Sequence, residues 1–313
     1  MGSSVDVVLV GGSPELLEQA AHDVAHLEFC WSRFLPHSDI SRLNNAGGSP
    51  LRVDPATVVL LRAMLDGWRA TGGGFDPTLL APLVGLGYAA SWHDPAAVTS
   101  LPSGASLRGN LDELVIDDVD SVVLAPIGLC LDPGGIGKGL AADLVVDRLL
   151  GAGADGASVS IGGDVCVRGA APQPGGWLVG VADPNDDVVE VAQLTMSAGG
   201  VATSGTFRRR WHCDDGQLVH HLLDPATGRP THHQREIVAV TVVAGGAAWA
   251  EVWTKAAMVR GAASLLALDE FGLGAQLTYA DMTTEVNRAW SVYATSVEQR
   301  SDLVGDEVDM IEV

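Results

Sequence analysis

The residues best suited to chemistry lie in one glycine-rich stretch, Asp132-Pro133-Gly134-Gly135-Ile136-Gly137-Lys138-Gly139. Glycine tolerates positive φ, so such a stretch can turn with its backbone N–H groups exposed. An apolar helical pattern follows at once, and a helix that begins here directs its amide dipoles back at the turn. Lys138 adds a full positive charge. The stretch therefore predicts a site for an anionic group such as a phosphate, and a glycine-rich turn without a ligand is the alternative.

The spacing excludes two common phosphate motifs. A Walker loop needs Gly five positions before its Gly-Lys pair and Ser or Thr directly after it, where this chain has Asp132 and Gly139. Residues 151–156 match the letters G-x-G-x-x-G. However, they follow a predicted helix over 139–150 and precede an apolar run, which reverses the order of a dinucleotide-binding motif. They are interpreted as the turn that ends this helix.

Composition and charge narrow the classes of partner. The 313 residues are 47% hydrophobic, which is enough for a substantial core, and the net charge is −21. Such acidity argues against nucleic acid and anionic membrane surfaces as partners. An anionic substrate therefore needs a local positive site. Of the 18 basic residues only Lys138 and Lys255 are lysines, and the rest are arginines. Because the chain otherwise uses arginine for its positive charges, each lysine is a candidate for a specific role.

Cysteine usage and hydropathy add further limits. The four cysteines are far apart and form no C-x-x-C pair, so we expect buried free thiols rather than a disulfide framework or a zinc site; they are Cys30, Cys130, Cys166 and Cys213. No run of residues is long and apolar enough to span a membrane. The first residues lack the order of a signal peptide, so the sequence as given predicts a cytoplasmic protein. An extracytoplasmic location is the alternative if the natural start differs.

Helices and strands that would position these residues are mixed along the chain. Helical spacing predicts helices over 14–31, 38–44, 54–71, 79–88, 139–150 and 247–261. Apolar runs predict strands over 5–10, 113–116, 121–124, 157–161, 165–168, 177–181, 189–196, 218–223, 237–243 and, as the last, 275–279. The absence of strict βα alternation favours an α+β fold with mostly antiparallel sheets and packed helices. We expect a single domain over 1–313, or two intertwined subdomains, with an acidic tail over 301–313.

Several stretches match one family in order. They are Phe34 with 38–44, Phe75-Asp76-Pro77-Thr78, 132–139, Gly162-Gly163-Asp164, 202–205 and 220–230. Together they resemble the FAD:protein FMN transferase (ApbE) family over roughly residues 25–280. The resemblance implies an ApbE, T-fold-like architecture and FAD as substrate. It also implies transfer of FMN to a Ser or Thr hydroxyl of an acceptor protein with an FMN-binding domain, with release of AMP. FAD hydrolysis to FMN and AMP, or FAD binding without turnover, are the alternatives.

The resemblance also implies roles for single residues. Phe34 matches an aromatic residue that packs on the isoalloxazine ring, with a core phenylalanine as the alternative. Further matches to cofactor contacts are Asp76, Thr78, Asp132, Lys138 and Leu222, and Thr203 and Ser204 are candidates for the phosphate or for receiving the target segment. His220 and His221 are adjacent in a predicted strand, so only one can face the site. We favour His221 as a base or orienting group over a hydrogen-bonded core histidine.

The predicted metal site departs from the family. The resemblance implies a Mg²⁺ held by a backbone carbonyl at Gly135 and by an Asp and a Thr four residues apart on a late helix. Here those helix positions hold Glu251 and Lys255. Glu251 can bind Mg²⁺ through oxygen, whereas a protonated lysine cannot. We hypothesise that the Lys255 ammonium lies at or beside the metal position and supplies part of the charge. A plain i,i+4 Glu–Lys pair is the alternative.

Overall fold

The computed structural model describes residues 3–295 and 311–312. The chain divides into two compact units, each assembled from separated segments. Unit 1 contains residues 25–137 and 208–231, and unit 2 contains residues 3–24, 138–207 and the described residues from 232 onward. Helix α1 (Glu15–Trp31) begins in unit 2 and ends in unit 1.

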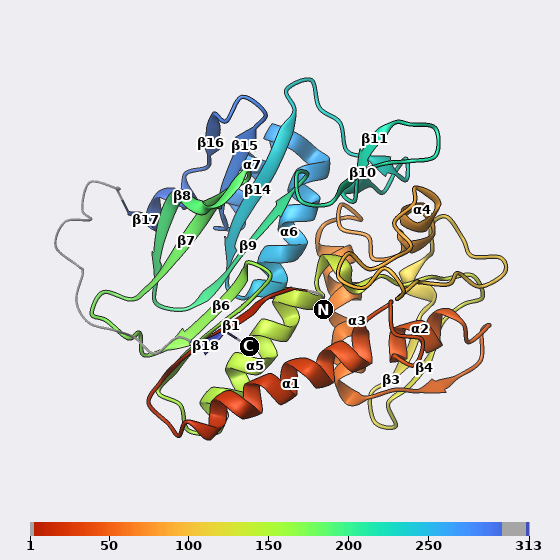
Figure 1. The fold of residues 1–313 in the computed structure, drawn as a ribbon, viewed down its shortest axis with the longest axis horizontal. Coiled ribbons are helices and arrows are strands. Elements are labelled where there is room, and N and C mark those ends of the chain that lie inside the picture. The colour runs from red at the N-terminus through yellow and green to blue at the C-terminus, as the bar shows by residue number, and fades with distance from the viewer. Residues whose placement is uncertain (1–2, 296–310, 313) are drawn as a thin grey trace. The chain divides into compact units, whose positions relative to one another are not determined.

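Unit 2 is built on an eight-stranded sheet in the order β16-β15-β14-β9-β6-β5-β1-β18 (Figure 1). All neighbouring strands described in it are antiparallel. The strands are β1 (Val5–Val10), β5 (Gly156–Ile161), β6 (Asp164–Gly169), β9 (Gly199–Gly205), β14 (Ile237–Ala244), β15 (Gly274–Tyr279), β16 (Thr284–Val286) and β18 (Ile311–Glu312). Residues 301–310 and 313 of the predicted acidic tail lie outside the described residues.

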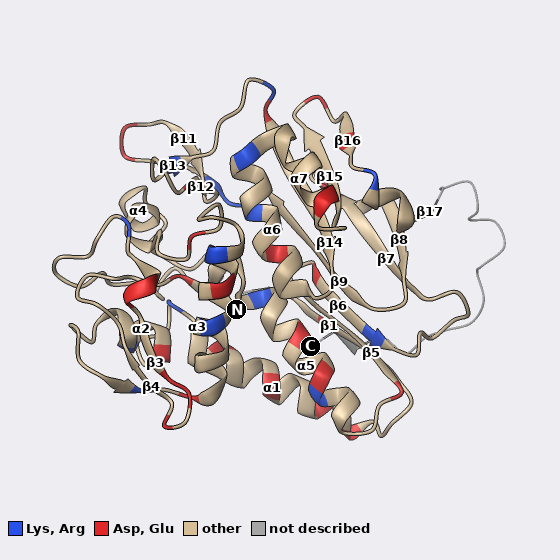
Figure 2. Ribbon diagram, turned by 180° about the vertical axis from the view of Figure 1, so that it is seen from behind, with Lys and Arg blue, Asp and Glu red and all other residues tan. Residues whose placement is uncertain are grey.

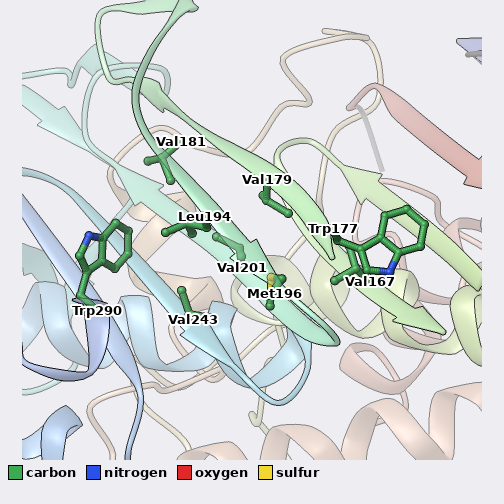
Figure 3. Packing of buried hydrophobic residues seen from close by; sticks show 9 residues of the cluster. All are labelled: Val167, Trp177, Val179, Val181, Leu194, Met196, Val201, Val243 and Trp290. Carbon is green, nitrogen blue, oxygen red and sulfur yellow. The ribbon is translucent and has the colours of Figure 1, made fainter. Parts of the chain in front are cut away.

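The large sheet of unit 2 is covered on both faces. Helices α5 (Gly137–Gly151) and α6 (Ala247–Arg260) lie over one face (Figure 2), and the shorter α7 (Ser264–Glu270) follows α6. A smaller sheet of β7 (Trp177–Asp183), β8 (Asp186–Met196) and β17 (Ala294–Thr295) covers the other face. Figure 3 shows the core between the two sheets, where large apolar side chains interdigitate; they include Val167, Val201, Val243, Trp177 and Leu194. Burial of these side chains fixes which face of each strand looks inward.

Strand β9 shows how that alternation places polar residues. Val201 packs in the core between the sheets, whereas its neighbour Ala202 packs against Ala250 of α6. Successive strand residues point to opposite faces. Ser204 therefore lies on the α6 side of the sheet, and Thr203 lies on the opposite side.

Unit 1 combines short helices with small antiparallel sheets. Its helices are α2 (Asp39–Asn44), α3 (Pro55–Ala70) and α4 (Leu80–Gly85). Its strands are β2 (Leu51–Arg52), β3 (Val115–Asp117), β4 (Val122–Leu124), β10 (Arg210–His212), β11 (Leu218–His220), β12 (Leu223–Asp224) and β13 (Arg229–Pro230). Side chains cap the starts of α2 and α3: Ser38 accepts from the Ser41 N–H at 3.1 Å, and Asp54 accepts from the Ala56 N–H at 2.8 Å.

The α+β class with antiparallel sheets is confirmed, and three details of the prediction are wrong. Residues 199–205 form a strand in the middle of the large sheet, 218–223 form two strands, and 275–279 is not the last strand. The strand β9 was not predicted because its sequence contains three glycines, and glycine is a weak strand former. Gly200 is required there, because a Cβ would lie 2.0 Å from the Ala247 nitrogen.

Two expectations about whole-chain properties can also be compared with the fold. Cys30, Cys130 and Cys166 are buried free thiols as predicted, whereas the free thiol of Cys213 is partly exposed. Within the part of the chain that the structure describes, no helix has the length and apolar character needed to cross a bilayer.

Candidate functional site

Two lysines and two carboxylates meet in unit 2. Lys138, in the first turn of α5, donates to Asp164 and to Oε1 of Glu251, the latter at 2.7 Å. The Lys255 ammonium donates to the same Oε1 at 3.1 Å. The other oxygen of Glu251, Oε2, accepts from the Gly139 N–H at 2.9 Å. The structure therefore brings both lysines of the chain to one carboxylate, and the four charged side chains are named here the lysine–carboxylate cluster.

A close approach of α5 to α6 positions this cluster. A Cβ at Gly139 would lie 2.4 Å from the carbonyl oxygen of Ala247, so only glycine allows the helices to approach this closely. One turn further along α5, Asp143 accepts from the N–H groups of Ala247 and Ala248 at 2.9 and 3.0 Å. It thereby satisfies the first amides of α6, which has no other side-chain cap. The two contacts fix the start of α6, and Glu251 follows one turn later.

A hairpin turn delivers the second carboxylate. Gly162 and Gly163 join β5 to β6 with φ values of 58° and 87°, a conformation that favours glycine. Asp164 follows as the first residue of β6 and is buried beside Lys138. The sequence had marked Gly162-Gly163-Asp164 only as a matched stretch. The Gly-Gly turn before a carboxylate was the available signal for this functional residue.

The glycine-rich stretch itself differs from the expectation. None of Gly134, Gly135, Gly137 and Gly139 adopts positive φ. Instead Asp132 caps a short 3₁₀ turn over Pro133–Gly135 by accepting from the Gly134 N–H at 2.9 Å. The expectation that glycine freedom opens this turn is wrong, because the tight packing at Gly139 is what requires glycine. The helix N-terminus does attract an anion, but that anion is the Glu251 carboxylate.

Burial and pairing act in opposite directions on the charges of the cluster. The Glu251 and Asp164 side chains are 0% and 2% exposed, and each lysine side chain is 18% exposed. Burial alone would raise the pKa of Glu251, yet Lys138 and Lys255 hold it at about 2. Burial would lower the pKa of Lys138, but Asp164 and Glu251 raise it. Burial, reinforced by the nearby Lys138, lowers the pKa of Lys255. For Asp164, burial outweighs the pairing and raises the pKa.

The two predicted phosphate-binding hydroxyls lie on opposite faces of β9. Ser204 is buried and hydrogen-bonds to the Thr254 hydroxyl at 2.7 Å, and that hydroxyl donates to the Glu251 carbonyl at 2.6 Å. Thr203 instead hydrogen-bonds to Thr241 at 2.9 Å on the other face. Ser204 therefore supports the helix that carries the cluster, and Thr203 does not lie beside it.

Unit 1 contains an aromatic group organised by one arginine. The Arg33 guanidinium lies 4.1 Å from the ring centre of Phe34 and 4.7 Å from that of Tyr88. It donates to the Thr99 hydroxyl at 2.8 Å and lies 3.5 Å from the Asp132 carboxylate. Such stacking and pairing hold a buried arginine in one orientation. Phe34 is half-buried, so its neighbours fix the position of its ring. No sequence pattern singled out Arg33 or Tyr88, although Arg33 directly precedes Phe34.

Asp76 and Thr78 form a buried loop anchor. One oxygen of Asp76 accepts from the Thr78 N–H at 2.9 Å and from its hydroxyl at 2.7 Å. The other oxygen lies 3.3 Å from Arg108 Nε. The Thr78 hydroxyl also accepts from the Gly109 N–H at 3.0 Å. The contact of Asp76 and Thr78 with a cofactor stays a prediction. The hydrogen bonds described give the pair a role in positioning the loop near Arg108 and Gly109.

Backbone bonds align the remaining predicted residues of unit 1. The Asn44 amide makes two bonds to the backbone of Leu131, at 2.7 and 2.9 Å, next to Asp132. Leu222 is buried, and its N–H donates to His220 Nδ1 at 3.3 Å. Strand β11 ends at His220, so the alternation used to choose His221 does not extend to it. The catalytic role of His221 stays a prediction. So does the pairing of Gly135, in unit 1, with Glu251, in unit 2.

Comparisons with known proteins agree with this geometry. The ApbE family model matches residues 1–276. A Klebsiella pneumoniae protein named FAD:protein FMN transferase is 29% identical over 269 residues, which cover 80% of each chain. An ApbE protein of Thermotoga maritima has a TM-score of 0.78 at 25% identity and covers 93% of this chain and 96% of its own. The flavinyl transferase ApbE of Pseudomonas stutzeri has a TM-score of 0.73 at 25% identity, with 92% of both chains covered.

These likenesses confirm the resemblance drawn from the sequence and extend it to the fold. The matched region includes the 132–139 stretch, the Gly-Gly turn before Asp164 and the helix with Glu251. The lysine–carboxylate cluster and the aromatic group thus both lie within the matched residues. The chain belongs to the ApbE family.

Proposed function

We propose that this chain is a flavin transferase that moves FMN from FAD to an acceptor protein and releases AMP. The relatives named FAD:protein FMN transferase support this reaction and FAD as its substrate. The observation that carries the proposal is the lysine–carboxylate cluster. It holds two ammonium groups on buried carboxylates in a chain of this family. Phosphoryl transfer depends chiefly on such fixed positive charge.

The proposed reaction forms one bond and breaks one bond at phosphorus. A Ser or Thr hydroxyl oxygen of the acceptor attacks the phosphorus on the FMN side of FAD. The bond from that phosphorus to the bridging oxygen breaks, and the electron pair leaves with AMP. The hydroxyl proton goes to a base, for which His221 is our candidate, or to solvent. Negative charge grows on the phosphoryl oxygens as this occurs, so ammonium groups held at a fixed position stabilise the transition state.

Each group is assigned to a part of FAD by its own chemistry. Lys138 and Lys255 suit the pyrophosphate, because ammonium groups donate to phosphate oxygens. Phe34 suits the flat isoalloxazine ring, because aromatic rings stack. The Arg33 guanidinium lies against the Phe34 ring and holds the Phe34 side chain in place. Within each unit, supporting roles fall to residues held by the hydrogen bonds described above. They are Asp76, Thr78, Asp132 and Leu222 in unit 1 and Ser204 in unit 2. Thr203 stays a candidate for the acceptor segment.

Mg²⁺ does not fit the donors around Glu251. Both oxygens of this carboxylate already accept bonds, and the nearby Thr254 hydroxyl is bonded at both its hydrogen and its oxygen. Lys255 offers no lone pair while it is protonated. Mg²⁺ requires near-octahedral oxygen coordination. The proposed reaction therefore includes no metal at this position.

One incubation separates the three candidate activities. The protein is mixed with FAD and an FMN-binding acceptor domain that carries a Ser or Thr target. Covalent FMN on the acceptor, seen as a mass increase and in-gel flavin fluorescence, supports the transferase. Free FMN and AMP without labelled acceptor indicate a pyrophosphatase. Unchanged bound FAD indicates a binding protein and would contradict the proposal.

A matched pair of variants ties the activity to the cluster. Lys138→Gln removes a cation that contacts both carboxylates, and Arg260→Gln removes a cation from the exposed end of α6. We expect transfer to fall in Lys138→Gln by at least about tenfold, the value of one charge-assisted bond, and to persist in Arg260→Gln. An equal loss of transfer in the two variants would mean that transfer depends on the overall charge of the protein and not on the cluster.

A further inference from the structure

We propose that Lys255 and Lys138 form a pyrophosphate-binding pair that makes a divalent metal at Glu251 unnecessary. This inference rests on the proposed function and concerns where its positive charge comes from. Lys138 lies on α5 and Lys255 on α6, and one oxygen of Glu251, Oε1, accepts from both ammonium groups. The charge that a metal would bring is thus supplied by the chain itself.

The donor geometry supports this assignment first. Glu251 Oε1 accepts from both ammonium groups, and Oε2 accepts from the Gly139 N–H. Three of the roughly four lone-pair sites of the carboxylate are therefore taken, so a metal would have to share the carboxylate with these donors or displace one of them. The side chain is 0% exposed, so no water would replace the lost bond. A buried donor left without a partner is costly, and the present arrangement is therefore favoured over a metal complex.

Thr254 gives a second, independent argument. It is the only hydroxyl residue of α6 and stands directly before Lys255. Its hydroxyl donates to the Glu251 carbonyl and hydrogen-bonds to Ser204. The Thr254 hydroxyl is thus already engaged on both sides, and helix α6 has no other hydroxyl beside Glu251 for a metal's coordination.

The distribution of charge gives the third argument. Two ammonium groups and two carboxylates make the cluster neutral, so it has no net negative charge to offset the cost of dehydrating Mg²⁺. The carboxylates are almost fully buried, while each lysine side chain is 18% exposed. The part of each lysine side chain that stays accessible lies beside carboxylates that are already paired, which suits the approach of an anion.

The hydrogen-bond capacity of the lysines agrees with an anionic ligand. Each ammonium has three N–H donors. Lys138 uses donors on Asp164 and Glu251, and Lys255 uses one on Glu251. The donors left over on the two lysines match the several oxygens of a pyrophosphate, and a pyrophosphate bridges two cations well because it has two charged groups.

The test measures metal and anion binding directly, apart from activity. The wild-type protein is titrated with Mn²⁺ while the free Mn²⁺ EPR signal is recorded, and with inorganic pyrophosphate in EDTA by calorimetry. We expect no Mn²⁺ binding that Glu251→Gln abolishes, and measurable pyrophosphate binding; the comparison with Glu251→Gln is needed because His26, Cys30 and Asp54 lie close enough together to hold a metal elsewhere. In Lys255→Ala, pyrophosphate binding should weaken by about tenfold or more, the value of one charge-assisted bond. Arg260→Gln should bind pyrophosphate as the wild type does.

A gain-of-function variant sharpens the test. Lys255→Thr removes the ammonium and places a hydroxyl four residues after Glu251, so it leaves the cluster with one net negative charge. We expect this variant to acquire a saturable Mn²⁺ site that the wild type lacks. Circular dichroism of both lysine variants verifies that they fold.

The transfer assay completes the comparison. Wild-type transfer should proceed at similar rates in EDTA and in excess Mg²⁺, whereas residual transfer by Lys255→Thr should depend on Mg²⁺. Mn²⁺ binding to the wild type that Glu251→Gln abolishes, loss of wild-type transfer in EDTA, or unchanged pyrophosphate binding in Lys255→Ala would each overturn the inference. Absence of FAD turnover under every condition would instead refute the proposed function, and the binding titrations would still decide the inference.

Discussion

Glu251→Gln is the most direct perturbation of the lysine–carboxylate cluster. The carboxylate has the pKa of about 2 given above, against an ordinary value of 4.5. At about 1.4 kcal/mol per pKa unit, this difference contributes about 3 kcal/mol to the free energy of unfolding. Removing one partner of a buried ion pair costs about 3–5 kcal/mol by mutation, which is the same order. We therefore expect Glu251→Gln to lower the free energy of unfolding by about 3 kcal/mol near neutral pH.

Urea denaturation followed by tryptophan fluorescence measures this loss. Glu270→Gln is the matched control, because the same change is made at an exposed position at the end of α7, and we expect no measurable effect. If Glu251→Gln does not fold, Lys255→Met replaces it. There Glu251 keeps its bonds to Lys138 and Gly139, so the loss should be smaller. Because the cluster is buried, added salt should change neither loss appreciably.

The pH dependence has a definite sign. The folded-state pKa of Glu251 lies below its ordinary value, so its stabilisation is fully present above pH 4.5 and is lost as the pH falls toward 2. The difference in unfolding free energy between wild type and Glu251→Gln should be constant at neutral pH and narrow below pH 4.5. A difference below about 1 kcal/mol at neutral pH, or one that widens in acid, would refute the ion pairing described here.

Three further predictions concern packing and binding. Gly139→Ala should lower the free energy of unfolding, measured in urea, by more than about 2 kcal/mol, because the new Cβ would lie 2.4 Å from the Ala247 oxygen. Gly151→Ala is the control and should be tolerated, because the space around Gly151 is open. Asn44→Ala should cost about 2–3 kcal/mol in the same assay, because both bonds to the buried Leu131 backbone are lost; an effect as small as that of Glu270→Gln would contradict this reading. Phe34→Ala should weaken FAD binding about tenfold in a flavin-fluorescence titration of the folded variant, as expected for loss of ring stacking, and unchanged affinity would assign Phe34 to packing alone.

The sequence by itself determined most helices and strands and the family. Their signals are local: helical spacing in α1 and α3, the continuous apolar run of β14, and short motifs in a fixed order. It also marked Lys138 and Lys255 as unusual, because lysine is otherwise absent from the chain. Both lysines are in the cluster. The reason for this success is that short motifs, periodicity and composition depend on neighbours in the chain.

Only the tertiary structure decided what these residues contact. Lys138 and Glu251 are 113 positions apart, and no local pattern reveals that Glu251 takes the amide of Gly139 as well as both ammonium groups. Likewise, Gly139 and Gly200 are explained by the approach of α6 and not by positive φ. Close packing between distant segments sets these contacts, and it brings two lysines from different helices to the buried Glu251 carboxylate.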